Sequence, residues 1–426
     1  MQRYESYKPS AIPWIDELPQ HWGEEKGKWL HRFRKDLNNR KQCDNVLSLT
    51  LRGVVNNDPD DPEGLVPKDY STYQIFEKDD LVFKLIDLEN FRTSRVGLAH
   101  ERGIMSPAYL RVQPGKEQNP RYFYYYYFTL YQQGIYNKLG AGVRSTLGPT
   151  DLLKIGVPVP RKDEQDSIVA FLDQKTAEID AAIAKKERMI ELLLEQKKIL
   201  ITQSVLRGLS QDVSLIASGI DWIGKIPSHW KIAPVYSKFT VQLGKMLDAK
   251  KISGRHLRSY LRNTDVQWDG INTENLPEMD IHPSEIERFS VRNGDLLVCE
   301  GGDVGRCSIW HSDEGSIGYQ KALHRVRPIS DARVNYFRYF MMAASQAGAL
   351  ASGANTNTIA HLTGEMFRRM RFTCPPSVEQ ESIASFLLQI ECHIKSAIRH
   401  VSKEIAALSE MKNCLIADIV TGKMKV

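Results

Sequence analysis

The residues of this sequence whose type and spacing suggest a binding function form two runs of basic side chains. Residues 26–41 contain seven Lys and Arg against one acid, and residues 244–262 contain six against one. A basic run is usually a solvated surface, but two runs at nearly corresponding places favour contact with a phosphate backbone. We therefore predict that DNA is contacted by Lys35, Arg40, Lys41, Lys245, Lys250, Lys251, Arg255, Arg258 and Arg262.

Arginines and asparagines in three loop-like segments could add the reading of bases. Arg suits guanine and Asn suits adenine in the major groove of DNA. Ordinary loop chemistry is the alternative for each of these residues. The candidates for base reading are Arg92, Arg95, Arg144, Asn355 and Asn357.

The motifs of common enzymes and metal sites are absent from the sequence. No HExxH, GxSxG, P-loop or Asn-Pro-Pro-aromatic tetrapeptide occurs, and the six cysteines show no CxxC spacing. His21 and His229 each stand in a Pro-x-His-Trp segment, which favours a structural turn over a catalytic site. Free thiols suit a reducing cytoplasm, and no run of eighteen apolar residues predicts a membrane span. We expect a cytoplasmic, non-catalytic chain that holds no metal or cofactor.

Two segments of the sequence occur twice. "WIDELPQHW" (residues 14–22) matches "WIGKIPSHW" (222–230) at five of nine positions. "DEQDSIVAFL" (163–172) matches "VEQESIASFL" (378–387) at six of ten positions. The offsets are 208 and 215 residues, so both motifs recur in the same order at nearly the same distance. This pattern predicts an internal duplication.

A long stretch without Pro or Gly follows each copy of the second motif, at residues 163–207 and 379–420. Apolar residues recur with a period of eleven in the first stretch and seven in the second, which predicts two long helices. We expect the helices to pack on each other, antiparallel, rather than each on its own domain. Glu164 and Glu379 are expected in the first turns, where acids favour the helix dipole. Partner binding is assigned to the apolar positions Ile179, Ile183, Ile190, Leu194, Ile394, Val401 and Leu408.

The remaining sequence mixes strand-like runs with short helical ones. The aromatic run at residues 119–128 is interpreted as the buried face of a helix, because aromatic side chains dominate cores by area. We predict an α+β fold: two globular domains separated by two long antiparallel, coiled-coil-like helices, with a pseudo-two-fold duplication. The predicted parts are a first globular domain (1–160), a first long helix (161–209), a linker (210–221), a second globular domain (222–376) and a second long helix (377–426).

With these motifs the chain resembles the specificity subunits of type I restriction-modification systems. The resemblance rests on the W-x4-P-x-H-W segment found twice, the Pro-rich segment followed by Glu-Gln and a helix found twice, and the glycine-containing helix ends "SVLRG" and "DIVTGK". It covers essentially the whole chain. It implies that the globular parts are target-recognition domains, each reading one half of a bipartite site in double-stranded DNA.

The resemblance also implies a division of labour. The helices would fix the spacing between the half-sites and dock two methylation subunits, and two restriction subunits would join through that complex. S-adenosylmethionine, ATP and Mg²⁺ would belong to those partners, and this chain would have no catalytic activity. Two alternatives remain open at this point: a stand-alone methyltransferase or nuclease, and a coiled-coil adaptor that binds no DNA.

Overall fold

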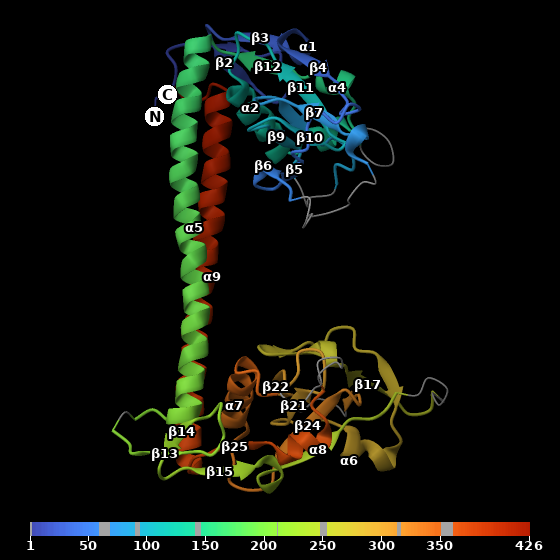
Figure 1. The fold of residues 1–426 in the computed structure, drawn as a ribbon, viewed down its shortest axis with the longest axis vertical. Coiled ribbons are helices and arrows are strands. Elements are labelled where there is room, and N and C mark those ends of the chain that lie inside the picture. Colours follow the sequence, from blue (N-terminus) through green and yellow to red (C-terminus); the bar gives the residue numbers. More distant parts are fainter. Residues whose placement is uncertain are drawn as a thin grey trace. The chain divides into compact units, whose positions relative to one another are not determined.

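The computed structural model describes residues 2–58, 69–89, 94–140, 146–210, 212–247, 254–312, 317–350 and 361–426. The chain divides into two compact units. Unit 1 comprises Met1–Glu187 with Ser402–Val426, and unit 2 comprises Arg188–Val401. Two long helices, α5 (Lys162–Arg207) and α9 (Ser377–Val420), each contribute one half to each unit (Figure 1). Both helices lie inside the ranges that the sequence predicts for them.

Unit 1 is built on a four-stranded antiparallel sheet covered by an aromatic helix. The strand order is β4 (His31–Arg34), β11 (Leu110–Pro114), β8 (Leu81–Phe83) and β9 (Val96–Leu98). Helix α2 (Pro120–Gln132) packs on it with five buried aromatic rings, from Tyr122, Phe123, Tyr125, Tyr126 and Tyr127. The prediction that the aromatic run is the buried face of a helix is therefore confirmed.

Smaller elements surround this sheet. Strand pairs are formed by β1 (Tyr7–Pro9) with β2 (Glu17–Pro19), β3 (Gly23–Lys26) with β12 (Gly156–Val159), β5 (Leu47–Thr50) with β6 (Gly53–Asn56), and β7 (Gln74–Phe76) with β10 (Gly103–Met105). The short helices are α1 (Gly27–Leu30), η1 (Tyr70–Thr72), α3 (Ile135–Leu139) and α4 (Pro149–Leu152). The buried Arg111 of β11 ties β7 to the sheet, because its Nη1 donates to the carbonyl of Ile75 at 2.8 Å.

Unit 2 repeats the sheet and its covering helix. The strand order is β16 (Phe239–Leu243), β24 (Leu323–Pro328), β21 (Leu296–Cys299) and β22 (Cys307–Ile309), again antiparallel. Helix α7 (Val334–Gln346) buries Tyr336, Phe337, Tyr339 and Phe340 against it. The pairs β13 (Leu215–Ala217) with β14 (Lys225–Pro227), and β15 (Lys231–Pro234) with β25 (Arg371–Cys374), correspond to β1–β2 and β3–β12. The duplication predicted from the sequence is therefore present in the topology.

The periphery of unit 2 differs from that of unit 1. A second sheet joins β20 (Glu278–Asp280), β17 (Leu257–Leu261) and β23 (Gly318–Tyr319), and β18 (Val266–Gln267) pairs with β19 (Gly270–Ile271). The short helices are η2 (Val235–Ser237), η4 (Asn263–Asp265), η5 (Pro283–Glu285), α6 (Ile286–Phe289) and α8 (Gly364–Arg369).

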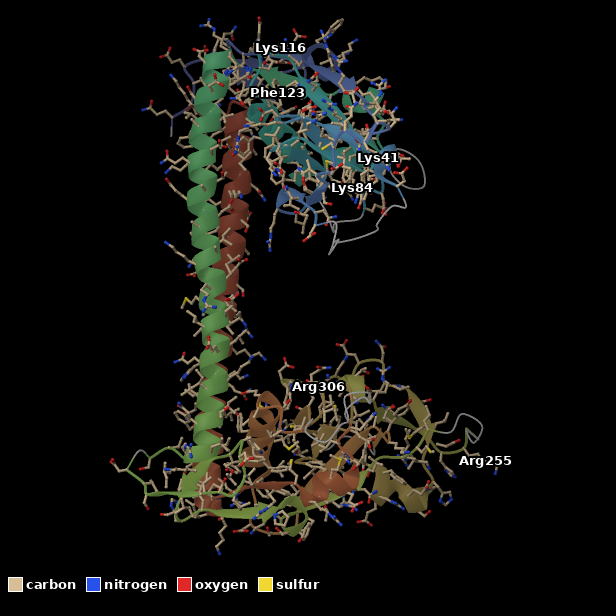
Figure 2. The ribbon with its side chains drawn as sticks, in the orientation of Figure 1. Lys41, Lys84, Lys116, Phe123, Arg255 and Arg306 are labelled. Carbon is tan, nitrogen blue, oxygen red and sulfur yellow. The ribbon has the colours of Figure 1, made fainter. Side chains whose placement is uncertain are left out.

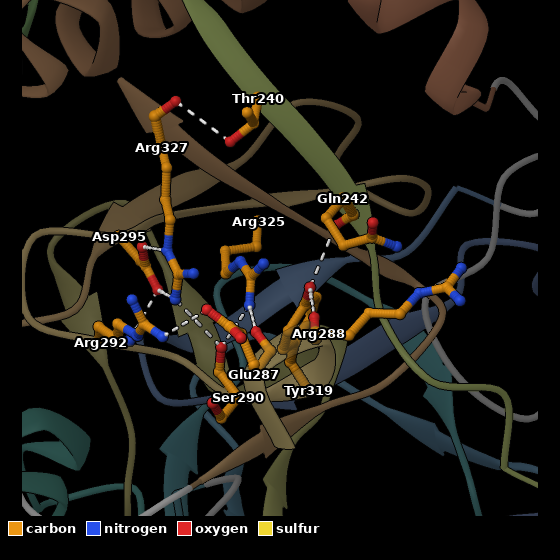
Figure 3. A network of polar contacts seen from close by, with 10 residues as sticks. All are labelled: Thr240, Gln242, Glu287, Arg288, Ser290, Arg292, Asp295, Tyr319, Arg325 and Arg327. Carbon is orange, nitrogen blue, oxygen red and sulfur yellow. Dashed lines mark hydrogen bonds and ion pairs between the residues drawn. The ribbon is translucent and has the colours of Figure 1, made fainter. Parts of the chain in front are cut away.

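Two arginines of β24 link the first sheet of unit 2 to its surroundings (Figure 3): the buried Arg325 reaches Tyr319 of the second sheet, and the partly exposed Arg327 pairs with Asp295, directly before β21. Arg325 of β24 donates through Nη1 to the carbonyl of Ser290 at 2.6 Å, and its guanidinium lies 5.5 Å from the centre of the Tyr319 ring. Arg327 donates through Nη2 to Asp295 at 2.8 Å. Arg111 and Arg325 occupy equivalent strands in the two units, and both are buried. These arginines therefore hold the fold together.

The halves of α5 and α9 within each unit run antiparallel. In unit 1, Lys412 pairs with Asp180 at 2.7 Å and Lys186 pairs with Glu404 at 2.6 Å. The residue number therefore rises along one helix as it falls along the other. In unit 2, Lys197 of α5 pairs with Glu391 of α9 at 2.8 Å. The predicted antiparallel pairing of the long helices is confirmed within each unit.

Candidate nucleic-acid interface and the duplicated helix clamps

The predicted basic residues of unit 1 lie on and after the edge strand β4. Lys35, Arg40 and Lys41 are all exposed, and Lys41 is labelled in Figure 2. Asn38 is only 2% exposed, and it organises the turn: its Oδ1 accepts from the backbone N–H of Gln42 at 2.8 Å, and its Nδ2 donates to the carbonyl of Cys43 at 2.8 Å. This buried amide presents the two cations of the turn to solvent.

The predicted basic residues of unit 2 differ in exposure, and two of them pair with acids of the same unit. Arg255 is exposed (Figure 2) and Arg258 is half-buried. Lys245 forms an ion pair with Glu285. Arg262 binds Asp265 with two hydrogen bonds, from Nε at 2.9 Å and from Nη2 at 2.7 Å. Lys245 and Arg262 would have to give up these acids to contact phosphate. Among the other candidates, Arg92, Arg144, Lys250, Lys251, Asn355 and Asn357 lie outside the described residues.

The position of Arg95 contradicts the prediction that this residue reads DNA. Its side chain is buried, with 2% of the residue exposed, and it donates to main-chain carbonyls of residues 84–87, including that of Asp87 at 2.6 Å. A guanidinium whose donors are used by buried carbonyls offers none to a base or a phosphate. The prediction that Arg95 reads DNA is therefore wrong, and its role is to close the loop after β8.

The two repeated motifs contact each other in both units. In unit 1, the Glu164 carboxylate of α5 accepts from Trp22 Nε1 at 3.0 Å and from the hydroxyl of Tyr4 at 2.8 Å, and it lies 2.9 Å from His21 Nε2. In unit 2, Glu379 of α9 accepts from Trp230 Nε1 at 3.0 Å and lies 2.9 Å from His229 Nε2. The His-Trp segment thus holds the first turn of a long helix.

The glutamine that follows each of these acids joins the helix to the aromatic helix. Gln165 accepts from the backbone N–H of Asn119 at 2.9 Å, directly before α2, and Gln380 accepts from that of Arg333 at 2.8 Å, directly before α7. Both glutamines are 1% exposed. The repeated Glu-Gln pair therefore has a specific packing role, beyond the helix-dipole role that the sequence suggested.

The same tryptophans also contact the end of the other long helix. Gly422 ends α9 with φ +75°, and a Cβ there would lie 3.2 Å from the ring of Trp22 and 2.3 Å from Pro19. Gly208 ends α5 with φ +77°, and a Cβ there would lie 3.2 Å from the ring of Trp230. Each unit thus grips the start of one long helix and the end of the other. We call the two sites helix clamps: Trp22, Glu164 and Gly422 in unit 1, and their counterparts in unit 2.

The apolar positions assigned to partner binding are mostly used inside the chain. Ile179, Ile394 and Val401 are 6–8% exposed, so their assignment to a partner surface is wrong, and they belong to this chain's own core. Ile183, Ile190 and Leu408 are half-buried, and Leu194 is 45% exposed. Sequence reasoning did not predict several exposed apolar side chains of the two helices, because they lie outside the apolar residues that recur with periods of eleven and seven. These side chains belong to Met189, Leu192, Ile199, Leu388 and Met411.

Among the residues that the structure describes, no group of three or more His, Cys, Asp or Glu could hold a metal ion. No helix in the described ranges is long and apolar enough to cross a membrane.

Part of the chain is similar to a known class of domain, and most of it is similar to known specificity subunits. Residues 55–192 match the type I restriction modification DNA specificity domain. The chain is 21% identical over 304 residues to the type I restriction enzyme EcoKI specificity subunit of Escherichia coli K12, across 70% of this chain and 63% of that protein. It is 19% identical over 323 residues to the StySPI specificity subunit of Salmonella potsdam, across 74% and 67% of the two chains.

Solved structures agree on the fold. A chain from a study of complex assembly and conformational transition of the type I R-M system matches with TM-score 0.70 and 12% identity, over 96% of this chain and 99% of that one. The HsdS subunit of Thermoanaerobacter tengcongensis matches with TM-score 0.55 and 14% identity, over 97% and 100%. The predicted α+β fold and the resemblance are confirmed: the chain is similar to type I restriction-modification specificity subunits, and its residues 55–192 match the DNA specificity domain of these systems. It matches 63% of the length of the E. coli relative.

Proposed function

We propose that this chain is the DNA sequence-specificity subunit of a type I restriction-modification complex, and that each unit reads one half of a bipartite site. One observation carries the proposal: residues 55–192 match a DNA specificity domain, and the strands β8, β9 and β11 and the helix α2 within this range recur in unit 2 as β21, β22, β24 and α7. Two copies of one scaffold provide two readers, and two readers suit a site with two separated halves.

The periphery of each unit supports the reading of different half-sequences. The sheet and aromatic helix are common to both units, whereas the β5–β6 hairpin belongs to unit 1 and the β17–β20–β23 sheet belongs to unit 2. Phosphate contacts fix the orientation of a protein on DNA, and base contacts give the sequence preference. The exposed cations after β4 and the exposed Arg255 suit the first task, and the differing peripheral elements suit the second.

The long helices would serve the assembly. We propose that they set the spacing of the half-sites and dock two methylation subunits, with the exposed apolar side chains of α5, Met189, Leu192 and Ile199, as part of the docking surface. Two restriction subunits would bind through that complex. The methylation and restriction subunits would bring S-adenosylmethionine, ATP and Mg²⁺, and this chain would carry no catalytic site. The place of action would be the cytoplasm, where the DNA substrate lies.

The test combines genome-wide mapping of methylated DNA sequences in cells with methylation assays on purified components. Cells that express this chain with its methylation subunit are expected to carry one new bipartite methylated sequence, and cells that lack this chain are expected to lose it. Purified chain alone should not methylate DNA with S-adenosylmethionine. Methylation by the chain alone would make it an enzyme, and a methylome that does not respond to its deletion would make it an adaptor.

A further inference from the structure

Trp29 of the short helix α1 is strongly exposed in unit 1. It is 71% exposed, whereas Trp22, seven residues earlier, is fully buried. Lys28 Nζ lies 4.8 Å from the centre of the Trp29 indole ring. An exposed Trp leaves a large apolar area in water, and Trp is enriched where proteins bind other molecules.

The corresponding turn of unit 2 also exposes an aromatic ring. Helix η2 follows β15 and precedes β16, as α1 follows β3 and precedes β4. Gly27 of α1 and Val235 of η2 are buried, and next to Val235 stands Tyr236, which is 59% exposed. Ile329, 56% exposed, adjoins this turn because its N–H donates to the carbonyl of Lys238 at 3.0 Å. We call α1 and η2 the aromatic turns of the two units.

Neither exposed ring is needed to form its turn. Backbone hydrogen bonds hold α1, from the N–H of Gly27 to the carbonyl of Ile155 at 2.9 Å and from that of Lys28 to Leu153 at 2.8 Å. In unit 2, the N–H of Val235 donates to the carbonyl of Met370 at 2.9 Å. Two units with different residues at this place both expose an aromatic ring there, which indicates a binding role.

The residues around the rings indicate the chemistry of the partner. The exposed cations near Trp29 are Lys26, Lys28, Arg32 and Lys116, against the acids Glu25 and Glu117. Beside Tyr236, Arg371 is exposed and lies opposite Pro234, and Lys238 at the end of η2 forms an ion pair with the exposed Asp331. An aromatic anchor surrounded by polar side chains is the usual arrangement of an interaction hot spot between proteins. The cationic rim suits a partner with acidic side chains around an apolar pocket.

We propose that each unit docks one copy of the same protein partner through its aromatic turn, with the ring of Trp29 or Tyr236 in an apolar pocket that has an acidic rim. The inference rests on the proposed function, in which the partner present in two copies is the methylation subunit. The two half-sites of a bipartite DNA sequence differ, and therefore a turn that exposes an aromatic ring in both units, Trp29 in one and Tyr236 in the other, suits a shared protein better than a DNA sequence.

The experiment counts partner copies in the assembled complex. The chain is co-expressed with the methylation subunit encoded beside it, and the mass of the native complex is measured at increasing partner concentration. Wild type should bind two copies. Trp29→Ala and Tyr236→Ala should each weaken one of the two sites by about 30-fold, the effect of losing a hot-spot side chain. At about ten times the wild-type Kd, wild-type sites should be about nine-tenths filled, and a site without its ring should be only about one-quarter filled.

Matched controls are Leu51→Ala in unit 1 and Leu257→Ala in unit 2, which remove other exposed apolar side chains, 63% and 43% exposed. Both should still bind two copies. A double variant that binds two copies within threefold of the wild-type affinity overturns the proposal. A double variant that keeps both copies but loses affinity for DNA also overturns it and assigns the turns to DNA. If wild type binds neither partner nor DNA, the proposed function itself has failed.

Discussion

Removing the carboxylate of Glu164 should loosen the helix clamp of unit 1 and leave unit 2 unchanged. In the Glu164→Ala variant, Trp22 Nε1 loses its acceptor at 3.0 Å while the indole stays buried, with 0% of Trp22 exposed. A buried donor without a partner costs about 1–3 kcal/mol. Tyr4 and His21 also lose their contacts, but both are partly exposed and can turn to water. The free energy of opening should therefore fall by about 2–3 kcal/mol in unit 1.

Amide hydrogen exchange is the suitable assay, because two units need not unfold in one step and exchange reports the free energy of local opening. Residues 17–26 should exchange faster in Glu164→Ala, as should residues 415–422 at the end of α9, which packs on the same Trp22. Glu379→Ala should produce the matched effect in unit 2. Glu164→Gln keeps an oxygen acceptor for the indole and should lose only about 1 kcal/mol.

The control is Glu187→Ala, since Glu187 lies on an exposed face of α5. Substitutions at such positions usually change stability by no more than about 0.5 kcal/mol. If Glu164→Ala behaves like this control, or if it speeds exchange equally in both units, the reasoning about separate clamps is refuted. Burial, together with the hydrogen bond to Glu164, raises the pKa of Tyr4, so the Tyr4 hydroxyl should remain protonated in alkaline solution and keep donating.

Three further predictions concern pH, salt and geometry. Burial against Phe123 lowers the pKa of His31 to about 4 in the folded state, whereas the pKa in the unfolded chain is about 6.5. Below about pH 6.5 the unfolded chain therefore binds a proton at His31 before the folded state does, which favours unfolding. Unit 1 should lose up to about 3 kcal/mol between pH 6.5 and 4, measured by urea unfolding, and His31→Phe should flatten this loss. Replacing Lys250, Lys251 and Arg255 together by Ala should reduce the slope of log binding constant against log salt concentration by about 2–3. An unchanged slope in fluorescence anisotropy titrations would show that these residues face solvent and do not contact DNA. Four residues added after Glu195 lengthen α5 by about 6 Å, so methylome mapping should find the same half-sequences with a spacer longer by about one or two base pairs.

The aromatic turns and the arginines show where sequence reasoning fails. Arg95 is buried and Trp29 is exposed, the reverse of what their residue types suggest. Arg95 is buried because main-chain carbonyls of residues 84–87 meet its guanidinium, and these come together only when the loop after β8 closes. Trp29 is exposed because α1 turns its Gly27 inward. Neither arrangement leaves a pattern in the sequence.

The sequence by itself determined the duplication, the two long helices and the buried aromatic helix, because each follows from a local period or from the repetition of a motif. Only the tertiary structure decided that Trp22 and Glu164, 142 residues apart, form one contact, and that Gly422 from the far end of the chain completes it. It also decided which apolar residues of the helices are used inside the chain. Ile179 is buried and Leu192 is 48% exposed, although both are apolar residues of α5. Helical period places each residue on a face, but burial depends on what packs against that face, and that is settled by contacts distant in sequence.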